Sequence, residues 1–266
     1  GVKNTAIGHA ALKLNDNANG KNTAVGYNAG TTLGSAYLNT IVGAEAADGI
    51  ATGLSNTVVG ARALGTADGA ESYNIAIGTD CMASVTGDSS VSNIAIGVDA
   101  LTGGTGTVIG NIAIGRNALN ATTNQAQTGT IAIGHEALTA LTTGTGNVAI
   151  GYLALAQNED GARNMAIGYG AMRAQQAGGD QDLSDGSSDN IFIGFQSGGG
   201  DWSNALSTAN VGVGNYVMDA DAMNGAINNT ALGYASLSGI TTGDNNIGVG
   251  HSAGENITIG ADNIAI

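Results

Sequence analysis

Asn4-Thr5-Ala6-Ile7-Gly8 is the first of a series of five-residue motifs that recur to the end of the chain. Later copies include Asn-Ile-Ala-Ile-Gly at 93–97 and Asn-Val-Ala-Ile-Gly at 147–151. Most copies start 17–20 residues after the previous one, one interval is 26 residues, and the last two are 10 and 7 residues. This near-fixed period predicts a solenoid, and it is too short for helix–turn–helix repeats of about 33 residues or more. Each period therefore predicts one coil of a parallel β-roll.

Within the motif, the residue types alternate as they do in a β-strand. The second and fourth positions are mostly β-branched, which suits a pleated and buried face. The first and third positions, Asn and usually Ala, point the other way. We therefore expect the second and fourth side chains inside the coil, and the Ala positions where an opposite wall or a neighbouring chain approaches closely.

The Asn and Gly of the motif predict two structural ladders. Stacked coils place Asn over Asn, as in the hydrogen-bonded ladders of cross-β structures, and Asn also suits a corner in which its side chain bonds nearby backbone. A Gly at one fixed offset indicates a turn that requires positive φ. The expected ladder residues are Asn4, Asn22, Asn39, Asn56, Asn74, Asn93, Asn111, Asn147 and Asn164, with Gly8, Gly26, Gly43, Gly60, Gly78, Gly97, Gly115, Gly134, Gly151 and Gly168.

A second element, x-x-Ala-Leu, follows the glycine in many copies, for example at 61–64 and 116–119. It predicts a short strand or tight turn with one inward Leu or Met. The remaining residues of each period are mostly Gly, Thr, Asn, Ser and Asp, and they predict a return loop.

Composition excludes several classes of protein. The 266 residues include 45 Gly and no Pro, and the formal net charge is −14. An acidic chain does not suit binding to the phosphate backbone, which needs clustered Lys and Arg, so we expect no nucleic-acid partner. The single cysteine, Cys81, excludes an intrachain disulfide and predicts a small buried side chain. No apolar run reaches the roughly 18 residues of a membrane span, so we expect no membrane insertion of this segment.

The motif N-x-A-I-G-x-x-A-L resembles the head repeats of YadA-like trimeric autotransporter adhesins. It is closer to the NTAIGxxAL arrays of phage and prophage tail-fibre proteins, because the adhesin head repeat is shorter. This resemblance covers essentially residues 3–266. It implies a left-handed parallel β-roll, three identical chains side by side, and a role in attachment to a surface. Together with the repeat it predicts an all-β solenoid of about 15 coils of 17–19 residues.

We expect a repeat array over residues 1–245, interrupted by an acidic loop at 175–189 and a Trp-containing loop at 196–208. The close spacing of the last copies, at Asn246, Asn256 and Asn263, leaves too little chain for complete coils. Residues 246–266 are therefore expected to exchange hydrogen bonds between chains around a common axis. Because the array is in phase at both ends, we expect this chain to be a segment of a longer protein.

Two of these interruptions contain candidate ligand-binding residues. The acidic loop carries Asp180, Asp182, Asp185 and Asp189, and clustered carboxylates are typical ligands of Ca²⁺. The EF-hand pattern fails, so a solvated acidic loop is the alternative. Trp202, the single tryptophan, is a candidate receptor contact that stacks on a sugar, or alternatively a ring that covers a coil edge. No other cofactor is expected.

The sequence predicts a structural and adhesive protein, most simply a segment of a phage tail fibre. Such a segment would be an extracellular virion component that acts as a homotrimer on a host-surface glycan or protein receptor. The alternative is the head of an adhesin on a bacterial cell surface. No nucleophile elbow or triad spacing is present, so an enzyme is not expected. An ice or mineral binder is a further alternative, because Thr5, Thr23, Thr40 and Thr57 form a row that Ile replaces from the fifth coil onward.

Overall fold

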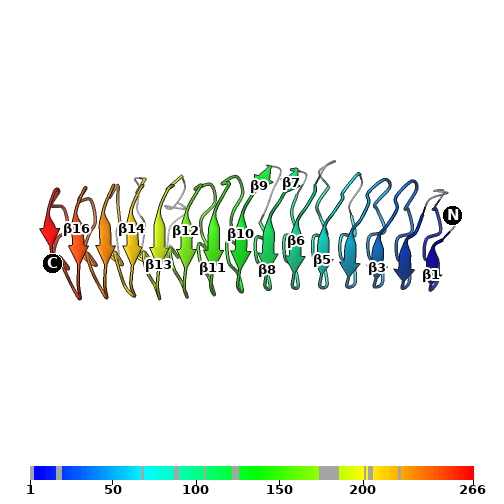
Figure 1. The fold of residues 1–266 in the computed structure, drawn as a ribbon, viewed down its shortest axis with the longest axis horizontal. Helices are drawn as coiled ribbons and strands as arrows, with labels where there is room; N and C mark the ends of the chain where they lie inside the picture. Colours follow the sequence, from blue (N-terminus) through cyan, green and yellow to red (C-terminus); the bar gives the residue numbers. More distant parts are fainter. Residues whose placement is uncertain are drawn as a thin grey trace. The chain divides into compact units, whose positions relative to one another are not determined.

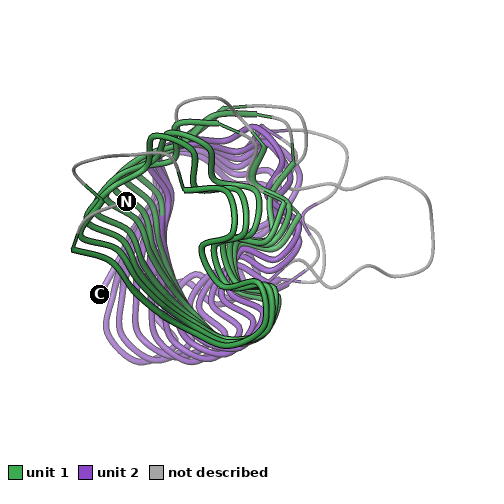
Figure 2. Ribbon diagram, turned by 90° about the vertical axis from the view of Figure 1, so that its right-hand side faces the viewer, with its two compact units in different colours: residues 1–130 green, residues 131–266 purple. Residues whose placement is uncertain are grey.

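The computed structural model describes residues 3–15, 20–66, 69–86, 90–104, 106–121, 126–173, 186–200, 202, 206–220 and 223–266. It divides into two compact units, residues 1–130 and 131–266. Each unit is a stack of coils, and the coils of one unit lie over one another when the unit is seen along its stacking direction (Figure 2).

Unit 1 contains seven successive strands of a parallel sheet and a second, two-stranded sheet. The seven strands point in one direction and lie side by side in chain order (Figure 1). They are β1 (Thr5–Ile7), β2 (Thr23–Val25), β3 (Thr40–Val42), β4 (Thr57–Val59), β5 (Ile75–Ile77), β6 (Ile94–Ile96) and β8 (Ile112–Ile114). The second sheet pairs β7 (Val108–Ile109) with β9 (Gln127–Thr128), also in parallel.

Unit 2 continues the same pattern with eight parallel strands in chain order. They are β10 (Ile131–Ile133), β11 (Val148–Ile150), β12 (Met165–Ile167), β13 (Ile191–Ile193), β14 (Val211–Val213), β15 (Thr230–Leu232), β16 (Ile247–Val249) and β17 (Ile264–Ala265).

Neighbouring strands of the main sheet pair in the register that the motif predicts. Ala95 lies opposite Ala113, and Ile96 lies opposite Ile114, so each motif position forms a row through the coils. The described residues include no helix. The predicted all-β parallel solenoid is therefore confirmed. Seven strands bound six complete turns in unit 1 and eight strands bound seven in unit 2, somewhat fewer than the 15 coils expected.

The predicted assignment of the two strand faces is wrong. The third-position Ala is fully buried in the inner coils, as at Ala76, Ala95 and Ala113, whereas Ala6 in the terminal strand β1 is exposed. The second and fourth positions are nowhere buried in the main-sheet strands, and Val42 and Val59 are each 37% exposed. The small residue thus faces the interior of the coil, and the β-branched residues face outward.

The interior of each coil is filled mainly by large side chains of the turn and of the segment after it, such as Leu138 and Leu141, which are both fully buried in one coil. In most coils the turn contributes a buried Leu or Met, as with Leu101 and Leu119, and the strand contributes Ala. Where the strand contributes Phe192, glycines surround the ring: a Cβ on Gly212 would lie 2.6 Å from Phe192 Cδ1, and one on Gly198 would lie 2.9 Å from it. Interiors are close-packed, so volume added by the strand must be removed nearby. Limited volume therefore favours Ala at the inward position, although Ile41 and Val58 are fully buried at the same position in two coils.

The x-x-Ala-Leu element forms a turn with its Leu inside, as one of the two expected forms predicts. Arg62 and Leu64 both have left-handed backbone, with φ of 53° and 50°, although neither is glycine. The amide of Leu64 donates to the carbonyl of Cys81 in the next coil over 2.8 Å. Positive φ is unfavourable for such residues. Each turn is therefore held by its bonds to the next coil.

The corner before each strand differs from the expected one. It is the residue before the ladder Asn that has left-handed backbone, for example Tyr73 with φ of 60° before Asn74. The Asn itself directly precedes the strand and points its amide into the coil.

Residues 246–266 close a coil within their own chain, so the premise that they leave too little chain for a complete coil is wrong, and the exchange between chains stays a prediction. The amide of Ile247 donates to the carbonyl of Asn263 over 2.8 Å, and Asn246 Nδ2 donates to the carbonyl of Gly260 over 2.7 Å. The last ladder step runs from Asn246 to Asn263, which is a normal period of 17 residues. The copy at 256–260 lies in the return segment between β16 and β17 and is no sheet strand.

Candidate functional site: ladders and an exposed sheet face

Buried asparagines form the predicted ladder along the inside of each unit. Asn93 Oδ1 accepts from the backbone N–H of Asn111 over 3.0 Å and from Asn111 Nδ2 over 3.3 Å. Asn93 Nδ2 donates to Asn74 Oδ1 over 3.0 Å and to the carbonyl of Val108 over 2.8 Å. One buried amide therefore connects the strand to the return segment of its own coil and to both neighbouring coils.

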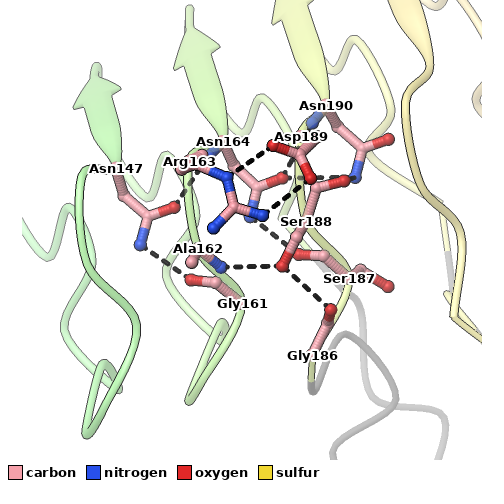
Figure 3. A network of polar contacts seen from close by, with 10 residues as sticks. All are labelled: Asn147, Gly161, Ala162, Arg163, Asn164, Gly186, Ser187, Ser188, Asp189 and Asn190. Atoms are coloured by element: carbon pink, nitrogen blue, oxygen red, sulfur yellow. Dashed lines mark hydrogen bonds and ion pairs between the residues drawn. The ribbon is translucent and has the colours of Figure 1, made fainter.

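Unit 2 contains the same network (Figure 3). Asn147 Oδ1 accepts from the amide of Asn164 over 2.9 Å, and Asn164 Oδ1 accepts from the amide of Asn190 over 3.1 Å. These asparagines are at most 1% exposed. A fully bonded buried amide stabilises the coil and offers no free group to a ligand. The structural interpretation of the Asn ladder is confirmed.

Thr130 is the one substitution in the asparagine row, and the structure leaves its hydroxyl buried without a hydrogen-bond partner. Its backbone N–H still donates to Asn111 Oδ1 over 2.9 Å. Thr130→Asn would remove the unpaired hydroxyl and add an amide donor beside Asn111. We expect this change to raise the free energy of unfolding by about 1 kcal/mol. Urea unfolding followed by circular dichroism measures it, with Thr128→Asn on an exposed part of β9 as the control that should change little. A loss of stability in Thr130→Asn alone would contradict the ladder's role.

The glycine row is also confirmed as structural. Gly78 has φ of 140°, and a Cβ placed on it would lie 2.3 Å from the carbonyl oxygen of Gly97 in the next coil. Gly60 and Gly97 have the same geometry toward their own following coils. Only glycine permits this backbone contact between coils.

The outward face of the main sheet is an uncharged, largely apolar surface that extends through each unit. It consists of the second and fourth motif positions, and none of these carries a charge in any strand of the sheet. Ile7 is 60% exposed, Val59 is 37% exposed and Leu232 is 51% exposed. Thr5, Thr40 and Thr57 lie on the same face of unit 1. Large apolar surfaces of this kind mark sites of association with other molecules.

The structure describes only one of the four expected calcium ligands. Asp180, Asp182 and Asp185 lie outside the described residues. Asp189 pairs with Arg163, whose Nε and Nη2 donate to its two carboxylate oxygens over 2.6 and 2.8 Å (Figure 3). The hydrogen bond from Arg163 lowers the pKa of Asp189. Within the described part of the chain, no group of three or more acidic, His or Cys side chains is placed to hold a metal ion.

Trp202 lies inside its coil and does not present a ring to a ligand. Its side chain is 2% exposed, and its Nε1 donates to the carbonyl of Gly198 over 2.9 Å. It meets Phe192 edge-to-face, with 5.8 Å between ring centroids. The expectation that Trp202 contacts a receptor is therefore wrong, and the ring belongs to the core.

Sequence reasoning missed a column of aromatic rings on the surface of unit 2. In chain order it consists of His135, Tyr152, Tyr169, Phe195, Tyr216, Tyr234 and His251. All but Tyr216 directly follow a motif glycine, so an aromatic recurring at this offset is the signal that could have revealed the column.

Cys81 is buried, as its place at an Ala position predicts. Its Sγ donates to the carbonyl of Ala95 over 3.2 Å, and burial raises the pKa of the thiol to about 12. Such a thiol stays protonated and unreactive at neutral pH.

The described residues contain no helix that is long and apolar enough to cross a membrane. Comparison of the chain with protein-family models and with curated proteins finds no match.

Proposed function

We propose that this chain is an adhesive fibre segment that works as a homotrimer, most simply in a phage tail fibre that attaches to a host surface. The observation that supports the association is the outward, uncharged and β-branched face of the main sheet. A single chain leaves this face in water along the whole of each unit.

Second and third copies of the same chain are the partners that fit this face best. The rows repeat at the spacing of neighbouring strands, about 4.8 Å, so an identical face offers side chains at the same spacing. The chain's net charge of −14 would make copies repel elsewhere, but the strands of this sheet carry no charged residue. Association through the sheet face therefore buries apolar surface without burying charge, which would cost several kcal/mol for each unpaired group.

Light scattering after size-exclusion chromatography tests the association. We expect a species of three times the 25.9 kDa of one chain. Val59→Asp, on the sheet face, should abolish that species because it would place an unpaired carboxylate in the interface of each chain. Val98→Asp is the matched control, because Val98 is similarly exposed, at 44%, but lies outside the sheet strands. A folded wild-type monomer at micromolar concentration would refute the proposal.

The attachment role is supported by the resemblance of the repeats and by the solenoid fold, and it is tested separately. The complete gene and its neighbours distinguish the two settings. Genes for virion structural proteins beside it support the tail fibre. A coiled-coil stalk and a C-terminal membrane barrel in the same gene would support the cell-surface adhesin instead. Hydrolysis of host glycans by the purified chain would contradict the expectation that it is not an enzyme.

A further inference from the structure

The aromatic column of unit 2 contains one pair of tyrosines in stacked contact. The ring centroids of Tyr152 and Tyr169 lie 5.0 Å apart, with 16° between the ring planes. Both rings are accessible to solvent, at 43% and 46% exposure. The two phenols therefore lie close together and within reach of small molecules in solution.

The backbone holds this pair from both sides. Strands β11 and β12 are paired in register, with Ile150 opposite Ile167. Beyond the strands, the amide of Gly170 donates to the carbonyl of Tyr152 over 2.9 Å, and the amide of Gln196 donates to the carbonyl of Tyr169 over 2.9 Å. The two side chains leave equivalent positions of adjacent coils, so like atoms of the two rings lie near each other.

The other rings of the column do not repeat this arrangement. Tyr169 stacks on its far side against Phe195, which has no hydroxyl, and Tyr152 stacks against His135. Tyr216 and Tyr234 meet edge-to-face, at 67° and 5.6 Å. Tyr152 and Tyr169 are thus the one stacked pair of phenols among the described residues.

We propose that Tyr152 and Tyr169 form an oxidative cross-linking site that joins two adjacent coils as dityrosine. The co-reactant is a one-electron oxidant from solution, of the class generated by peroxidases or by photosensitisers. Each phenol gives one electron to the oxidant and its hydroxyl proton to water, which leaves two phenoxyl radicals. The radicals couple between ring carbons ortho to oxygen, and the hydrogens on those carbons then move to the two oxygens. The net change is one new C–C bond, two C–H bonds broken, and two electrons and two protons lost.

The structure favours coupling at this pair over coupling elsewhere. Two radicals formed in adjacent coils need only a side-chain rotation to meet, because their backbones are already hydrogen-bonded. Tyr73 is more exposed, at 59%, but it has no ring contact with another tyrosine among the described residues. The cross-link would close a loop between neighbouring coils of unit 2 and restrict their separation on unfolding. This inference depends on contacts within one chain and not on the proposed trimer.

The test uses the full chain with photo-excited tris(bipyridyl)ruthenium and persulfate as the oxidant. We expect dityrosine fluorescence, a mass loss of two hydrogens in the intact chain, and a cross-linked peptide that joins Tyr152 to Tyr169. Tyr169→Phe keeps a stacked ring but removes the phenol, so it should lose this peptide. Tyr73→Phe is the control that should retain it.

A mixture of Tyr152→Phe and Tyr169→Phe chains separates coupling within a chain from coupling between chains. Neither variant holds both phenols, so the mixture should give no link between these two positions. The proposal is overturned if the mixture forms that link, if Tyr169→Phe retains the wild-type yield, or if the oxidised wild-type chain couples other tyrosines in preference to this pair.

Discussion

Gly78→Ala should destabilise unit 1 by about 3 kcal/mol or more, since it combines backbone strain with a clash that no side chain can relieve. The added Cβ would lie 2.3 Å from the carbonyl oxygen of Gly97, and the φ of 140° is disfavoured for alanine. That carbonyl belongs to the neighbouring coil, which cannot move away without breaking the ladder. Urea unfolding and hydrogen exchange of the amides around Gly97 measure the loss.

Gly110→Ala is the matched control in the same unit. Gly110 also has positive φ, of 64°, but a Cβ there would have nothing within 4 Å. Its cost should be limited to the left-handed backbone of alanine, about 1 kcal/mol. Equal losses in the two variants would mean that coil-to-coil contact at the glycine row does not limit stability.

Asn93→Ala should have a comparable effect for a different reason. The change removes the acceptor of the Asn111 amide and the donors to Asn74 and to the carbonyl of Val108. A buried polar group left without its partner costs about 1–3 kcal/mol, so two or three such groups should cost about 3 kcal/mol or more. Thermal and urea unfolding should both detect it, together with faster exchange of the Asn111 amide.

Asn120→Ala is the same chemical change outside the ladder. Asn120 is only partly buried, and its Oδ1 accepts from the hydroxyl of Thr102 over 2.7 Å. We expect a loss of no more than about 1 kcal/mol. If Asn93→Ala were as mild as this control, the buried amides would be interchangeable with small apolar groups and the ladder would not hold the coils.

The Asn and Gly rows differ from the outward sheet face in whether they are available to bind a partner. The side-chain amides of the Asn row are hydrogen-bonded within one chain, and the Gly row packs against the backbone of the next coil. Neither row therefore presents a free group to a partner. The outward rows of Ile, Val, Leu and Thr differ, because a single chain leaves them partly or largely exposed. Partner binding is therefore better sought on the sheet face and on the aromatic column than at Trp202 or along the ladders.

The amino-acid sequence by itself determined the period, the parallel strands and the two structural ladders. A repeated Asn such as Asn93 predicts a hydrogen-bonded row, and a repeated Gly such as Gly78 predicts a required backbone geometry. These predictions succeed because each depends on local chemistry and on stacking, which the period already implies. The buried Cys81 and the inward Leu of the turn follow from the same reasoning.

Only the tertiary structure decided which face of the strand is inside. Alternation separates Ala95 from Ile94 and Ile96, but both faces are apolar, so hydrophobicity does not distinguish them. The side chains of the turn occupy much of the coil interior, so a small residue such as Ala95 is buried there while the bulkier Ile94 and Ile96 face outward.

The C-terminal copies and the aromatic column depended on tertiary structure for a similar reason. The segment 256–260 matches the strand motif, but in the folded chain it lies in the return segment between β16 and β17. Tyr152 and Tyr169 become a pair only when their coils are stacked, since 17 residues of chain separate them. Residue types and spacing determine what each coil can form, whereas available volume and the contacts between coils determine which side chains remain on the surface for a partner.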